Sequence, residues 1–117
     1  MPSVFFPSSK TRFVNKEEII GQLKLLAKQS AERNTNIKAI YLFGSFAKDQ
    51  YTVYSDADLL IVLSHDARLP RDRIPEFLFY FVDAPIPVDV FPFTKEEIGQ
   101  NPFLQKAQVT GILLVSQ

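Results

Sequence analysis

The sequence predicts an α/β fold in which helices flank a mixed β-sheet, and three observations lead to this prediction. Some segments place apolar residues at helical spacing, and others are short runs rich in β-branched residues. These two kinds of segment alternate along the chain. The chain has 117 residues, enough to bury one core, and no repeat or linker divides it. We therefore expect a single domain over residues 1–117.

The first half of the chain predicts one helix and two strands. Residues 15–34 carry an apolar stripe at helical spacing, and Asn15 is suited to cap the helix. Residues 37–43 and 57–64 are short and apolar. The second run is apolar on both faces, which predicts a central strand. A short helix fits residues 45–51.

The next two elements are a helix and a strand. Pro75 disfavours a helix that runs continuously from Arg71, but proline is favoured in a first helical turn. We therefore predict a helix over residues 75–82. Residues 86–93 are predicted to be the third strand.

The last segments carry clear boundary signals. Thr94 with Glu97 three residues later forms a capping-box pattern at a helix start. Pro102 near the start and Gly111 at the end delimit a further helix. Residues 112–116 close the chain as a short strand.

Composition restricts the class of protein. Thirteen basic residues balance thirteen acidic ones, so a long nucleic acid is not an expected partner. No apolar run approaches the roughly 18 residues of a membrane helix, and the N-terminus lacks signal-peptide features. Without cysteine and with one histidine, thiolate and all-imidazole metal sites are excluded. We expect a cytoplasmic protein that does not bind membranes.

Two carboxylates precede the second predicted strand. Asp56 and Asp58 are two residues apart, so in an extended chain they point the same way and repel each other. Asp89 lies between valines in the third predicted strand. Burying such a carboxylate is costly unless something compensates its charge. A divalent cation reverses this cost, and Mg²⁺ is usually held by carboxylates together with substrate phosphates.

A phosphate site is predicted close to these carboxylates. Gly44 and Ser45 lie where one strand ends and a helix can begin, a place where free backbone N–H groups bind phosphate. If the two strands are antiparallel neighbours, the Gly-Ser turn and the aspartate pair share one edge of the sheet. The sequence then predicts a site that holds metal against a triphosphate.

The combination of these motifs resembles a known superfamily. Gly44-Ser45, the segment "SDADL" at residues 55–59 and the "VDV" strand around Asp89 look like the nucleotidyltransferase superfamily of DNA polymerase beta. The chain length is similar to that of its minimal nucleotidyltransferase branch. The resemblance extends over about residues 37–97.

The resemblance implies a role for each motif residue. Gly44 and Ser45 would bind the nucleotide phosphates, and Asp56 and Asp58 would hold two Mg²⁺ ions. Asp89 would ligate the catalytic ion and help to deprotonate an acceptor hydroxyl. The implied function is Mg²⁺-dependent transfer of a nucleoside monophosphate, with AMP from ATP expected.

Two positions bear on how closely the chain follows the superfamily pattern. The superfamily often has glycine four residues after the serine, where this chain has Asp49. The basic residue common just before that position is present as Lys48.

Minimal relatives commonly pair with a small helical HEPN protein, and some act as antitoxins by attaching AMP to a tyrosine of that toxin. A HEPN-type protein is therefore the favoured partner and acceptor, and a homodimer is the alternative. Two other functions stay open: a non-catalytic antitoxin-like binding module, and a nucleotidyltransferase that acts on a small molecule such as an aminoglycoside.

Other conspicuous residues have simpler interpretations. His65 is predicted to be a loop residue and not a ligand. The arginines at positions 68, 71 and 73 are predicted to form a solvated rim or a partner contact. The Phe-rich run at 77–81 is interpreted first as core and second as a subunit interface.

Overall fold

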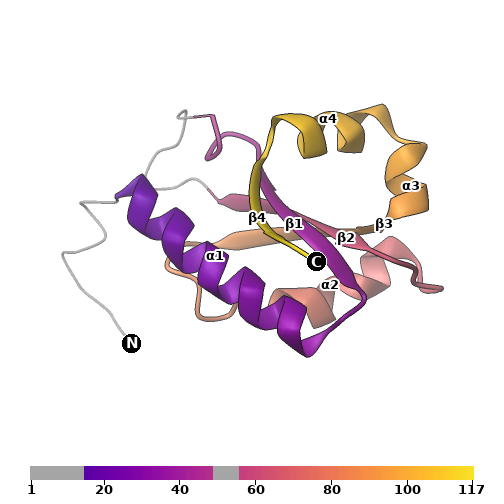
Figure 1. Cartoon of the computed structure of the whole chain (residues 1–117), viewed down its shortest axis with the longest axis horizontal. Coiled ribbons are helices and arrows are strands. Elements are labelled where there is room, and N and C mark those ends of the chain that lie inside the picture. The colour runs from indigo at the N-terminus through magenta and orange to yellow at the C-terminus, as the bar shows by residue number, and fades with distance from the viewer. Residues whose placement is uncertain (1–14, 49–55) are drawn as a thin grey trace.

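The computed structural model describes residues 15–48 and 56–117, which form a four-stranded sheet in the order β3-β2-β1-β4 (Figure 1). The central pair, β1 (Ile37–Phe43) and β2 (Ala57–Leu63), is antiparallel. β4 (Ile112–Ser116) is antiparallel to β1, and β3 (Val88–Thr94) is parallel to β2. The predicted mixed sheet and the central position of the second strand are confirmed.

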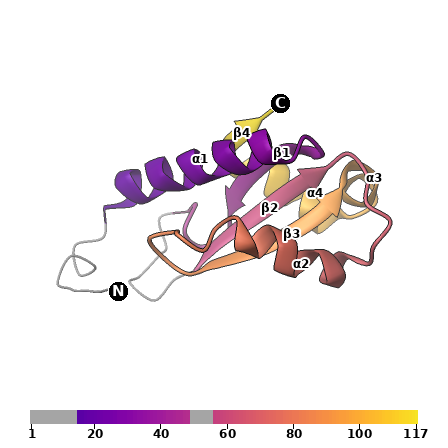
Figure 2. The same ribbon diagram turned by 90° about the horizontal axis from the view of Figure 1, so that it is seen from below.

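Two helices cover each face of this sheet. In Figure 1, α3 (Lys95–Gly99) and α4 (Pro102–Thr110) lie above the strands, and α1 (Lys16–Arg33) and α2 (Pro70–Phe79) lie below them. Figure 2 shows α2 packed along β3. None of the described helices is long and apolar enough to cross a membrane.

Each face has its own core. On the α1/α2 face, Leu23 and Phe77 pack against alternate residues of the central strands. On the α3/α4 face, Leu60 and Val62 of β2 pack against Leu104 and other side chains of α3 and α4. β2 is therefore buried on both sides, which explains its almost continuous apolar sequence.

The predicted caps are confirmed at two helices. The Asn15 carboxamide oxygen accepts hydrogen bonds from the N–H groups of Glu17 and Glu18 at the start of α1. At α3, the Thr94 hydroxyl accepts from the Glu97 N–H and the Glu97 carboxylate accepts from the Thr94 N–H, the complete capping box.

Gly111 ends α4 without the left-handed conformation that is common for glycine at a helix end. Its φ is −78°, which any residue can adopt. A Cβ at this position would come within 2.6 Å of the Ala107 carbonyl oxygen and 2.8 Å of the Leu42 carbonyl oxygen. Glycine is therefore needed so that α4 can turn directly onto the backbone of β1.

The helix predicted over residues 75–82 was misplaced. It begins at Pro70, the first helical position, where proline costs no hydrogen bond, and it contains Pro75. Pro75 cannot donate to the Arg71 carbonyl, but both residues are exposed, so water can satisfy that oxygen. The helix ends at Phe79 and is followed by turns.

The helix fitted to residues 45–51 is not present where the chain is described. Residues 45–48 form a turn, closed by a 3.2 Å hydrogen bond from the Lys48 N–H to the Ser45 carbonyl. Residues 49–51, including Asp49, lie outside the described residues.

Arg73 is not on a solvated rim, contrary to the prediction. Its side chain is 1% exposed, and its guanidinium donates to the carbonyl oxygens of Asp66, Arg68 and Pro92. It also forms a two-pronged ion pair with Glu97, at 2.7 and 3.0 Å. Arg73 therefore ties α2 to the end of β3 and the start of α3.

The neighbouring arginines remain at the surface. Arg68 pairs with Asp66 and Glu76, and Arg71 is 82% exposed. His65 is in a loop as predicted, where its backbone N–H and carbonyl bond the side chain of Asn36.

Candidate active site

The predicted phosphate turn and the pair Asp56 and Asp58 lie together where β1 ends and β2 begins. This end of the central strands is called the acidic edge of the sheet. Phe43, the last residue of β1, pairs with Asp58 near the start of β2. Because β1 and β2 are antiparallel, Gly44 and Ser45 leave the sheet beside the point where the carboxylate enters it. The two strands are therefore the antiparallel neighbours that the predicted site requires.

Gly44 has two reasons to be glycine. Its φ is +82°, in the left-handed region that favours glycine. A Cβ built there would also overlap the Asp58 carboxylate. The backbone of the turn therefore touches the carboxylate directly, and any larger residue would separate the two.

Asp89, in β3, lies at the same edge on the other side of β2. β3 runs parallel to β2, and Asp58 is in register with Asp89. Alternation along β2 places Asp56 and Asp58 on the side of Leu60, and Asp89 lies on the same side as Phe91. The three aspartates thus share the α3/α4 face.

The electrostatics of this edge disfavour three negative charges. Partial burial raises the pKa of Asp58, and the charges of Asp89 and Asp56 raise it further. Asp56 and Asp89 are exposed. Within residues 15–48 and 56–117, no ion pair joins any of these carboxylates to a basic side chain.

The donor set suits Mg²⁺ but is not a closed metal centre. In the described part of the chain, no group of three or more His, Cys, Asp or Glu side chains is assembled into a metal site. Mg²⁺ is commonly bound by one or two carboxylates, with phosphate oxygens and waters completing the octahedron. Adjacent carboxylates beside the Gly44-Ser45 turn fit that mode of binding.

A lysine that sequence reasoning missed contacts the predicted phosphate turn. The ammonium of Lys16, in the first turn of α1, donates to the Ala47 carbonyl at 3.4 Å. This brings a positive charge to the segment that follows Ser45. No local pattern signals such a contact, because the two residues are far apart in sequence.

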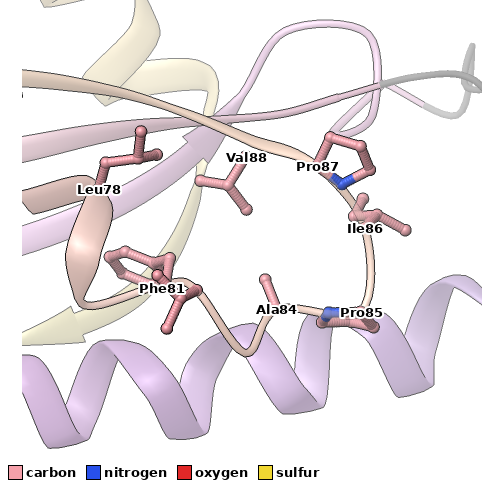
Figure 3. A pocket seen from close by; sticks show the side chains of 8 residues that line it. Leu78, Phe81, Ala84, Pro85, Ile86, Pro87 and Val88 are labelled. Carbon is pink, nitrogen blue, oxygen red and sulfur yellow. The ribbon is translucent and has the colours of Figure 1, made fainter. Parts of the chain in front are cut away.

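An apolar groove of about 340 Å³ lies near this edge but on the other face (Figure 3). Its eight lining side chains fall between Leu78 and Val88, and all are apolar. Val88 packs with the α1/α2 core, so its side chain points away from the face that carries Asp89. The groove offers no polar side chain for a phosphate.

The Phe-rich segment has both buried and exposed side chains. Phe77 and Phe81 are buried in the α1/α2 core, which confirms the first interpretation. Phe79 and Val82 are each 67% exposed, and Leu78 is 39% exposed. The interface interpretation remains a prediction for these outward-facing residues.

Comparison with known proteins decides the family. A sequence model described as "Nucleotidyltransferase domain" matches residues 23–110, which include the turn and all three aspartates. The chain belongs to this family. No curated protein matches the sequence.

The nucleotidyltransferase fold recurs in solved structures. A candidate nucleotidyltransferase from Sulfolobus solfataricus is 18% identical and has a TM-score of 0.68, covering 97% of this chain and 94% of its own. A structure described as a toxin-antitoxin with AMP-PNP is 19% identical and has a TM-score of 0.51, covering 89% of this chain and 75% of its own. At these identities the likeness establishes the fold alone.

Proposed function

We propose that this nucleotidyltransferase transfers AMP from ATP to a hydroxyl group in a Mg²⁺-dependent reaction. One observation carries the proposal: the Asp58 carboxylate lies against the Gly44 backbone and in register with Asp89 at one edge of the sheet. Phosphates bound at the turn would rest beside acidic groups that need a cation. This arrangement suits the polyanionic part of a nucleoside triphosphate.

Each residue of the candidate site has a proposed role. The backbone N–H groups of Gly44 and Ser45, with the exposed Ser45 hydroxyl, would bind the β- and γ-phosphates. Asp56, Asp58 and Asp89 would hold two Mg²⁺ ions, which when bound neutralise charge on the transferring phosphoryl group.

The proposed transfer forms one bond to the α-phosphorus and breaks another. The acceptor oxygen forms a bond to the α-phosphorus, and the bond from that phosphorus to the bridging oxygen breaks. Pyrophosphate leaves with the electron pair of that bond. The acceptor proton passes to the carboxylate of Asp89, which is exposed and can reach an incoming hydroxyl.

A tyrosine of a small helical HEPN-type partner is the proposed acceptor, in a cytoplasmic toxin-antitoxin system. The structural neighbour described as a toxin-antitoxin with AMP-PNP supports this choice. The exposed Phe79 and Val82 supply apolar surface of the kind found in protein interfaces. A homodimer is the alternative assembly.

Removing the central carboxylate tests the catalytic assignment. Asp58→Asn, alone and with Asp56→Asn, should abolish Mg²⁺-dependent pyrophosphate release in the presence of the acceptor. Asp72→Asn is the matched control, because Asp72 is 58% exposed on α2 and should leave the rate unchanged. Undiminished release by the double variant would overturn the assignment.

A pair of alanine variants tests the phosphate turn. Gly44→Ala should prevent ATP binding, because the added Cβ meets the Asp58 carboxylate and the φ is unfavourable. Gly21→Ala on α1 is the control, since nothing lies within 4 Å of its Cβ position. Titration calorimetry with ATP and Mg²⁺ measures both. Equal affinity in the two variants would place the phosphates elsewhere.

Co-expression with the product of the adjacent gene tests the acceptor. Mass spectrometry should show one or more AMP units on the partner, and none when Asp58→Asn replaces the parent chain. A partner that binds without gaining mass would favour the non-catalytic antitoxin. Modification of an aminoglycoside-like compound by the chain alone would favour the small-molecule enzyme.

A further inference from the structure

A cluster of three phenylalanines lies on the face that carries the aspartates. The rings of Phe43 and Phe91 are 5.3 Å apart at 64°, and those of Phe43 and Phe103 are 6.2 Å apart at 79°, both edge-to-face. Such contacts are the preferred geometry of aromatic pairs. The three rings come from β1, β3 and α4, so the cluster links the sheet to its covering helix.

The cluster begins at the carboxylates. Phe43 is the cross-strand partner of Asp58, and Phe91 follows Asp89 by two residues on the same face of β3. The row of rings therefore leads away from the acidic edge towards α4. Phe103 is its outer end.

Phe103 is exposed to solvent in the first turn of α4. Its side chain is 64% exposed, whereas that of Leu104 is 3% exposed and packs inward. Pro102 occupies the first helical turn, and the Asn101 side chain accepts hydrogen bonds from the N–H groups of Phe103 and Leu104. The cap fixes the backbone, and the ring makes an edge-to-face contact with Phe43.

We propose that Phe103 is the stacking surface for the base of the bound nucleotide, an inference that rests on the proposed function. With the phosphates at Gly44 and Ser45, the α-phosphate lies beside Asp58 and Asp89. The nucleoside continues from that phosphate, and among the described residues the exposed ring at the end of the row on this face belongs to Phe103. An aromatic nucleobase gains contact area there.

Stacking on a phenyl ring should not discriminate between bases. Every base has a π-face, so stacking adds affinity without hydrogen-bond readout. Phe103 should therefore strengthen the binding of ATP and GTP alike. Its contribution should be absent for a ligand that has phosphates and no base.

The test compares ATP with inorganic tripolyphosphate, each with Mg²⁺, by titration calorimetry on the purified full chain. Phe103→Ala should weaken ATP binding by roughly 5- to 150-fold, the range for loss of one stacked base. It should leave tripolyphosphate affinity unchanged. Phe103→Tyr should retain ATP affinity.

Leu25→Ala is the control, since Leu25 is also a large exposed apolar residue, at 56%, but lies on α1 across the sheet. It should change neither affinity. Unchanged ATP binding by Phe103→Ala overturns the stacking inference and leaves the proposed function intact. Equal losses for ATP and tripolyphosphate overturn it too, because the effect would not depend on the base. If the parent chain binds neither ligand, both the inference and the proposed function fail.

Discussion

Replacing Arg73 by methionine should destabilise the fold severely although the substitution keeps the aliphatic volume. The buried guanidinium satisfies the carbonyl oxygens of Asp66, Arg68 and Pro92 and neutralises Glu97. Methionine cannot donate to any of them. Breaking a buried ion pair by removing one partner costs about 3–5 kcal/mol, largely through the groups left uncompensated.

The lower end of that range applies here. Glu97 is 35% exposed, so water can partly solvate its carboxylate after the substitution. A loss of about 3 kcal/mol is a large part of the roughly 5–15 kcal/mol that stabilises an ordinary domain. It corresponds to a fall in melting temperature of roughly 10 °C or more.

Urea unfolding followed by circular dichroism measures this loss. Arg71→Met is the matched control, because Arg71 is on the same helix with its side chain 82% exposed and should change stability by less than about 0.5 kcal/mol. Glu97→Gln should cost less in the Arg73→Met background than in the parent chain, since the pair is already broken. A loss below about 1 kcal/mol for Arg73→Met, or additive effects of the two substitutions, would refute the reasoning.

Three further outcomes follow from contacts described above. Gly111→Ala should cost about 1–3 kcal/mol by overpacking two backbone oxygens, and Gly99→Ala, which meets nothing within 4 Å, should not; urea unfolding compares them. Hydrogen bonds from Arg68 hold the pKa of Asp66 at about 2, below its ordinary value, so the stability it contributes is present above pH 4 and is lost as pH falls towards 2; melting curves against pH should show this loss, and a flat profile would contradict it. Asp58→Asn should raise the melting temperature in metal-free buffer, because burial and neighbouring carboxylates disfavour its charge, and a lowered melting temperature would contradict that explanation.

The fold could be predicted where local sequence and tertiary structure agree. The apolar run of β2 predicted a strand buried on both faces, and β2 lies between β1 and β3 with helices on either side. Pro75 misled the prediction of α2. Its cost is small because it sits on the exposed side of the helix, and exposure is decided by tertiary packing.

The candidate site could be predicted in its residue types but not in its assembly. The residue types of Gly44, Asp58 and Asp89 indicated phosphate and metal binding, yet their proximity depends on strand order and direction, which spacing does not determine. Arg73 was misjudged because arginine is usually exposed, and nothing local reveals that Glu97 pairs with it from another helix. Phe103 was overlooked for the same reason, since its neighbour Phe43 belongs to another element.

The two faces of the sheet should differ in how readily they open. The α1/α2 face contains sixteen buried core residues among those described, and the α3/α4 face contains seven. Local opening follows the amount of apolar contact, so amide protons of α4 should exchange with solvent faster than those of α1. The α3/α4 layer can thus loosen while the larger core holds the chain folded. Binding of a nucleotide against Phe103 would slow that exchange, which makes α4 the reporter of an occupied site.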